Sequence, residues 1–217
     1  MKPYDKILDI LLKGYIEILG DIMTGFYVHG SIALGSFSSE NSDIDFIVTV
    51  NERLGFSDKL KIVKLCDSVT PLAPKKGIEM SIVQERYARE IVYPTPYELH
   101  FSEFYRDTVN SNPSAICGDE GKTDVDLAAH FVVIRRSGIT LYSTPAREMF
   151  GPVRREYYLD SVLADIKAED DEIVAAQEVD KDAIILRHGR ARAPIERDRR
   201  DLARVRLLVR HGVAHQL

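Results

Sequence analysis

Three carboxylates are spaced so that they could hold a metal ion. Asp43 and Asp45 stand two residues apart at the start of an apolar segment that ends at Val50. Because side chains alternate across a β-strand, this spacing places both carboxylates on one face. Like charges so close repel each other, and Mg²⁺ is a hard cation that joins carboxylates to phosphate oxygens. Glu79 lies inside another apolar segment, where a lone charge is costly to bury. We expect the three acids to converge on divalent metal.

A turn suited to phosphate precedes the aspartates. Phe26 to His29 predicts a short buried strand, and Gly30-Ser31 follows it directly. A glycine and a hydroxyl residue at a strand-to-helix turn expose backbone N–H groups that bind anions. Each pattern alone is common in ordinary turns and strand ends. Their order along the chain, however, predicts a nucleoside triphosphate bound with metal and attacked in line.

Hydrophobic spacing predicts the elements that position these residues. Apolar residues recur every three to four positions from Tyr4 to Leu19, which favours an amphipathic helix. Short apolar runs predict strands, and longer periodic runs predict further helices. The expected strands are 26–29, 43–50, 77–83 and 140–142, the expected helices are 57–69, 127–134 and 154–168, and 110–123 is expected to be a loop. This order predicts an α+β or α/β fold with one mixed sheet flanked by helices.

Five blocks of sequence resemble the aminoglycoside adenylyltransferases that modify streptomycin and spectinomycin, within the polymerase-β-like nucleotidyltransferase superfamily. Gly30-Ser31 with Ser42-Asp43-Ile44-Asp45 is similar to the signature of the superfamily. The five blocks are Tyr27 to Ser31, Ile78 to Val83, Tyr93 to Phe104, Asp124 to Ala128 and Leu141 to Val153. The later blocks narrow the resemblance from the superfamily to this family, and the resemblance covers roughly residues 20–165.

The resemblance implies roles for individual residues. Asp43 and Asp45 would bind two Mg²⁺ ions, and Glu79 would bind metal or act as general base on the acceptor hydroxyl. The residues expected to contact ATP are Gly30, Ser31, Ser42 and Asp126. The implied reaction is attack of a hydroxyl on the α-phosphorus of ATP, with release of pyrophosphate.

The implied acceptor is a cationic antibiotic, for which Glu98 and Phe104 are the candidate contacts. The segment 98–126 holds seven acids against Arg106 and Lys122, a balance that attracts cations. The family commonly has a tryptophan where Phe104 stands and uses it against streptomycin, whereas this chain has no tryptophan. That difference favours spectinomycin. Another metabolite or a protein as acceptor, or a remnant without activity, are the alternatives.

The composition indicates which binding partners and which cellular compartment to expect. Residues 1–181 carry 20 lysines and arginines against 30 acids, so nucleic acid is not the expected partner. We find no apolar run long enough to cross a membrane and no signal peptide. Cys66 and Cys117 are expected to be buried thiols in a reducing cytoplasm. We expect a cytoplasmic monomer.

The end of the chain departs from the pattern of the family. Residues 1–153 match a nucleotidyltransferase domain, and 154–181 resemble the start of a helical C-terminal domain. Residues 182–217 then carry nine arginines, no lysine and four acids. One interpretation is a truncated C-terminal domain followed by codons read out of frame. The other is a genuine divergent tail whose basic amphipathic helix docks on the acidic body of the chain or on a partner.

Overall fold

Five strands form one mixed sheet in the part of the chain that the computed structural model describes, residues 2–118 and 121–167. Their order across the sheet is β5–β3–β2–β1–β7, with β2 and β3 parallel and the other neighbours antiparallel. The strands are β1 (Met23–Val28), β2 (Ile44–Val50), β3 (Ile78–Gln84), β5 (Leu99–Phe101) and β7 (Ile139–Ser143). A separate two-stranded sheet pairs β4 (Thr95–Pro96) with β6 (Thr123–Asp124).

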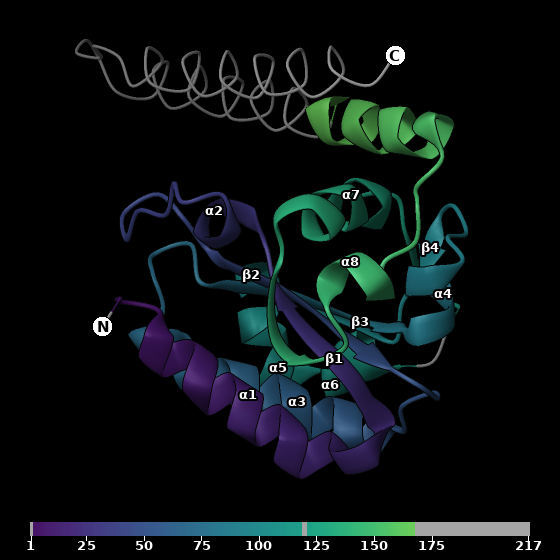
Figure 1. Cartoon of the computed structure of the whole chain (residues 1–217). Helices are drawn as coiled ribbons and strands as arrows, with labels where there is room; N and C mark the ends of the chain where they lie inside the picture. Colours follow the sequence, from purple (N-terminus) through teal and green to yellow (C-terminus); the bar gives the residue numbers. More distant parts are fainter. Residues whose placement is uncertain (1, 119–120, 168–217) are drawn as a thin grey trace, which may run out of the picture. The chain divides into compact units, whose positions relative to one another are not determined.

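Helices cover both faces of the main sheet (Figure 1). The long helices α1 (Asp5–Leu19) and α3 (Phe56–Val69) pack together on one face, and α7 (Leu127–Ser137) and α8 (Ala146–Met149) lie over the other. Residues 155–167 form a further helix. The short helices are α2 (Gly30–Ala33), α4 (Glu85–Arg89), α5 (Arg106–Ser111) and α6 (Pro113–Cys117), with 3₁₀ turns at Gly20–Ile22, Thr70–Leu72 and Glu103–Tyr105.

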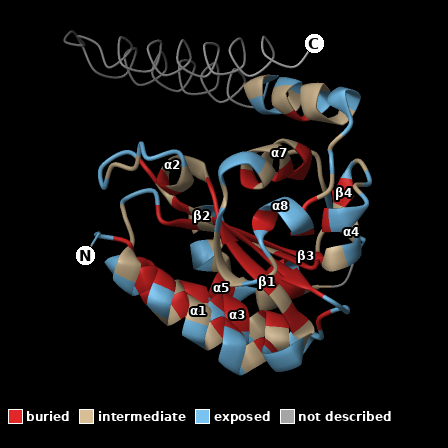
Figure 2. Cartoon of the chain, in the orientation of Figure 1, coloured by how far each residue is buried: buried red, intermediate tan, exposed pale blue. Residues whose placement is uncertain are grey.

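The sheet separates two hydrophobic cores, and the alternation of side chains assigns each strand residue to one of them. Phe46 and Val48 of β2 pack in the core beneath α1 and α3, whereas Ile47 packs with Phe131 of α7. Figure 2 shows the resulting buried interior of the sheet. A central strand buried on both faces is continuously apolar. Asp45 alternates with Phe46 and therefore lies on the α7 face.

The predicted mixed sheet flanked by helices is confirmed, with differences in three segments. The strand predicted at 26–29 begins at Met23, because Met23 pairs with Val50 across the sheet. The segment 110–123 was expected to be a loop but holds α6, which begins at Pro113. Proline suits the first turn of a helix, where its missing N–H needs no acceptor. The three-residue strand β5 was not predicted, because so short a run has no readable period.

The chain divides into two units, Met1–Lys167 and Ala168–Leu217. The second unit lies outside the described residues, and with it the Arg-rich segment 182–217. The expected domain boundaries at 153 and 181 therefore stay predictions. Cys66 and Cys117 are buried free thiols, as predicted. No helix in the described part of the chain has both the length and the apolar character needed to span a bilayer.

Candidate active site

The three predicted acids meet at one end of the parallel strands. Asp45 near the start of β2 stands directly opposite Glu79 on β3, and Asp43 precedes β2 by one residue. One carboxylate oxygen from each of the three lies within 4.8 Å of the others. The parallel register brings the acids together, because it aligns the first residues of β2 and β3, which are separated by 27 residues in the sequence. Three oxygen ligands at this spacing fit a hard divalent cation.

The acids disturb each other's ionisation. Burial, followed by the charges of Asp43 and Glu79, raises the pKa of Asp45 to about 8. Burial also raises the pKa of Glu79 to about 7, with Asp43 and Asp124 as the next largest causes. Lys76 acts in the opposite direction on Asp45. The cluster is therefore short of positive charge when its carboxylates ionise, and a bound cation would supply that charge.

The Gly30-Ser31 turn lies against these acids. Gly30 opens α2 with a φ of +58°, a conformation that glycine adopts without strain. The backbone N–H of His29 donates to the carbonyl oxygen of Asp45 at 3.0 Å and so ties the turn to β2. The hydroxyl oxygen of Ser31 is buried and has no hydrogen-bond partner among the described residues. A buried hydroxyl without such a partner is available to a ligand atom.

Ser42 and Asp126, the other residues expected at the nucleotide, have different surroundings. The Ser42 hydroxyl is buried and accepts a hydrogen bond from the backbone N–H of Ser38 at 3.0 Å. This bond stabilises the loop between the two residues. Asp126 immediately precedes α7 without a side-chain capping hydrogen bond, and its backbone N–H donates to the carboxylate of Asp124 at 2.7 Å. One carboxylate oxygen of Asp126 is buried without a partner in the described residues.

A second group of acids lies close to Glu79, and the sequence did not show it as a group. It consists of Asp124, Asp126 and Asp165, all of which raise the pKa of Glu79. Burial, then Asp124 and Asp165, raises the pKa of Asp126 to about 6. Asp165 is brought in by the helix 155–167, whose Ser161 hydroxyl donates to the Asp126 carbonyl at 3.2 Å. No local pattern could have predicted a contact over this sequence distance.

Two histidine rings lie close together next to the Gly30-Ser31 turn. The rings of His29 and His130 lie 5.0 Å apart between centroids, which joins the residue before Gly30 to α7. Burial lowers the pKa of His29 well below its ordinary value, and the neighbouring His130 lowers it further. Burial lowers the pKa of His130 as well. Both rings are therefore neutral at pH 7 and add no positive charge to the acids.

The two residues predicted to contact the acceptor lie in different places. Phe104 is 86% exposed and follows Glu103, whose side chain covers Gly77 beside the first residue of β3. It therefore lies at the end of the sheet that holds the acids. Glu98 lies at the opposite end of β3, where its backbone N–H bonds to the Ile82 carbonyl.

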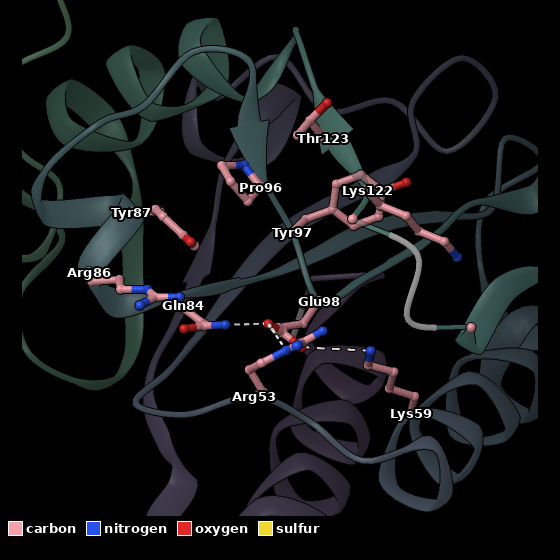
Figure 3. Close-up of a pocket in the computed structure, with 12 residues that line it drawn as sticks. Arg53, Lys59, Gln84, Arg86, Tyr87, Pro96, Tyr97, Glu98, Lys122 and Thr123 are labelled. Carbon is pink, nitrogen blue, oxygen red and sulfur yellow. Dashed lines mark hydrogen bonds and ion pairs between the residues drawn. The ribbon is translucent and has the colours of Figure 1, made fainter.

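The Glu98 carboxylate is fully engaged inside the protein (Figure 3). It is only 7% exposed, accepts hydrogen bonds from the Leu54 backbone and the Gln84 amide, and lies 3.6 Å from the ammonium of Lys59. The structure therefore does not bring Glu98 to the acids, and its assignment as an acceptor contact stays a prediction. The sequence alone could not reveal that Lys59 of α3 is its partner.

Comparison with known proteins agrees with this geometry. Residues 9–98 match the nucleotidyltransferase domain family. This part of the chain is a nucleotidyltransferase domain. The match spans the Gly30-Ser31 turn and all three acids of the cluster.

The fold of the nucleotidyltransferase domain also appears among solved structures. The spectinomycin adenyltransferase AAD(9) from Enterococcus faecialis, crystallised with ATP and spectinomycin, matches with a TM-score of 0.65 and 19% identity, over 93% of this chain and 88% of that one. A toxin–antitoxin structure with AMP-PNP matches with a TM-score of 0.34 and 12% identity, over 82% and 98%. No curated protein matched the sequence.

Proposed function

We propose that the chain is an adenylyltransferase that moves AMP from ATP to a hydroxyl of an aminocyclitol or aminoglycoside antibiotic, with spectinomycin favoured over streptomycin. The observation that carries this proposal is the meeting of Asp43, Asp45 and Glu79 within 4.8 Å beside the Gly30-Ser31 turn. The likeness of the fold to a spectinomycin adenyltransferase solved with ATP supports it.

The residues present fit Mg²⁺. Asp43, Asp45 and Glu79 offer hard oxygen ligands, and burial together with the charges of Asp43 and Glu79 raises the pKa of Asp45. When bound, the metal would neutralise charge that develops on the phosphate oxygens during transfer. The Ser31 hydroxyl, which no described residue partners, and the backbone of the turn would hold the phosphates in place.

Glu79 is suited to accept the proton of the attacking hydroxyl. A hydroxyl is a weak nucleophile at neutral pH, and a general base works best with a pKa near the working pH. In the metal-free protein burial raises the pKa of Glu79 to about 7, and a cation bound nearby would lower it, so the carboxylate would be ionised and able to accept a proton at neutral pH. We assign Glu79 this role, with Asp43 and Asp45 positioning the triphosphate through the cation.

Asp124, Asp126 and Asp165 give the acceptor side of the site its charge. The negative charges of all three raise the pKa of Glu79, so they lie close to the place where the acceptor hydroxyl would be activated. Carboxylates attract the protonated amines of an aminocyclitol and disfavour an anionic acceptor. The exposed Phe104 ring at the same end of the sheet is available for contact with the apolar face of the drug.

The experiment is pyrophosphate release from ATP and Mg²⁺ with spectinomycin or streptomycin as acceptor. We expect release with spectinomycin to exceed release with streptomycin, and both to require the antibiotic. No release with either drug, together with transfer of label from α-labelled ATP to a protein, would favour the alternative acceptor. No transfer under any condition would show that the chain is not an active adenylyltransferase.

A further inference from the structure

A separate pocket of about 320 Å³ lies at the other end of the parallel strands. The acids stand at the start of β2 and β3, whereas this pocket includes Gln84, the last residue of β3, and Arg53, which follows β2. Of the described residues that line it, four carry a cationic side chain, namely Arg53, Lys59, Arg86 and Lys122. The pocket is therefore distinct from the candidate active site in both place and charge.

The two arginines come from equivalent places in the topology. Arg53 follows the end of β2 by three residues, and Arg86 follows the end of β3 by two. Because β2 and β3 are parallel neighbours, both arginines stand beyond the carboxyl ends of the same pair of strands. In open sheets that contain parallel strands, this position commonly binds ligands, because the loops there diverge and leave a crevice.

The floor of the pocket is built around Glu98. Lys59 is 2% exposed and Glu98 7% exposed, and the two form an ion pair (Figure 3). The Gln84 amide donates a hydrogen bond to the Glu98 carboxylate beside this pair. Both oxygens of Glu98 accept hydrogen bonds within the protein, from Leu54 and Gln84. The negative charge of Glu98 is thus largely neutralised, and it opposes an incoming anion only weakly.

The guanidinium groups of the two arginines are available to a ligand. Arg53 is two-thirds exposed, with its Nε 4.0 Å from Glu98. The Arg86 guanidinium lies 4.6 Å from the ring centroid of Tyr87 and forms no ion pair with a carboxylate of the described residues. Lys59 pairs with Glu98, and Lys122 donates to backbone carbonyls. We therefore expect the two arginines to be the main contacts of an anionic ligand. A guanidinium fork matches phosphate oxygens geometrically.

We propose that this pocket binds a small phosphate monoester. Arg53 and Arg86 donate to the phosphate, and the rings of Tyr87 and Tyr97 contact the organic part of the ligand. Two guanidinium groups favour a dianion over a singly charged carboxylate. The residues between Gly118 and Gly121 lie outside the described part of the chain and have no part in the proposal.

The test is a calorimetric titration with phenyl phosphate in EDTA, without ATP or Mg²⁺, so that nucleotide transfer plays no part. The variants are Arg53→Gln and Arg86→Gln, with Arg136→Gln, an exposed arginine at the end of α7, as matched control. We expect each pocket variant to weaken binding about 10-fold or more, as the loss of a charge-assisted hydrogen bond predicts. Arg136→Gln should leave binding unchanged.

Three further binding measurements test the proposal. Asp45→Asn should bind phenyl phosphate like the wild type, and loss of binding there would place the ligand at the acids and overturn the proposal. Benzoate should bind much more weakly, and equal binding would overturn the assignment to a phosphate. Absence of binding by the wild type at millimolar phenyl phosphate would overturn the site itself. Thermal unfolding of Arg53→Gln and Arg86→Gln should match the wild type, since both arginines are surface groups.

Discussion

Gly30 leaves no room for a Cβ atom against the carboxylate of Asp45, because an added Cβ would overlap Oδ2 of that side chain. Gly30→Ala is therefore expected to displace the Asp45 carboxylate and to reduce transfer about 100-fold or more, as misplacement of reacting groups does. The measurement is the kcat of nucleotidyl transfer.

Gly35→Ala is the matched control for this prediction. Gly35 also has a positive φ, of +71°, but an added Cβ there meets nothing within 4 Å. Both variants carry the backbone strain of about 1–2 kcal/mol that a left-handed residue with a Cβ incurs. Equal loss of activity in the two would show that the strain, and not the overlap with Asp45, is responsible.

The contribution of the acid cluster to the stability of the metal-free protein should fall as pH rises. Asp45 has a pKa of about 8 in the folded chain, and an unfolded aspartate titrates near pH 4. Between these values the unfolded state releases a proton that the folded state retains, so the free energy of unfolding decreases from about pH 4 to pH 8. For Asp45 alone the decrease is on the order of 5 kcal/mol.

Urea unfolding in EDTA from pH 5 to pH 9 measures this effect. Glu79, with its pKa raised to about 7, adds a change of the same sign. Asp45→Asn should flatten the pH dependence, and saturating Mg²⁺ should restore stability most at the alkaline end. A wild-type protein that is equally stable across this range in EDTA would contradict the account of the cluster.

Glu98 is expected to contribute to stability through its buried pair with Lys59. Glu98→Gln replaces the charged partner of a buried lysine with a neutral amide, and losing hydrogen bonds to a charged group costs about 1.5–3 kcal/mol. Glu40→Gln is the matched control, because its pair with Lys75 is exposed and worth at most about 1 kcal/mol. A Glu98→Gln variant of normal stability but with a raised KM for spectinomycin would instead support its role as an acceptor contact.

Ser31→Ala should weaken ATP binding without weakening the fold. The Ser31 hydroxyl is buried and has no partner in the described residues, so its removal breaks no hydrogen bond. Loss of one hydrogen bond to a charged phosphate should raise the KM for ATP about 10-fold or more. Ser68→Ala, on the exposed side of α3, should leave both quantities unchanged. An unaltered KM for ATP in Ser31→Ala would remove Ser31 from the nucleotide site.

The sequence was sufficient for the parts of the site that depend on local pattern. The spacing of Asp43 and Asp45 and the apolar run around Glu79 predict strands, and parallel pairing of those strands brings the acids together. The Gly30-Ser31 turn is equally local, since it follows a buried strand directly. These elements have a strong period and a fixed order, and the structure confirms their meeting.

Contacts between distant segments could not be predicted in this way. Asp165 reaches Glu79 only because the helix 155–167 packs on α7 through Ser161. Glu98 looks like an exposed acid in the sequence, yet Lys59 of α3 partners it inside the protein. In both cases tertiary packing decides the environment of a carboxylate, and its neighbours in the sequence carry no information about that packing.

The most direct test of the central claim is binding of Mn²⁺, a paramagnetic substitute for Mg²⁺, followed by the electron paramagnetic resonance signal of the free ion. Wild-type protein should bind Mn²⁺, Asp45→Asn should bind it more than about 10-fold more weakly, and Asp9→Asn, at an exposed pair with Lys13, should bind it normally. Equal affinity of the wild type and Asp45→Asn, or no binding by the wild type, would contradict the claim that these three acids form a metal centre.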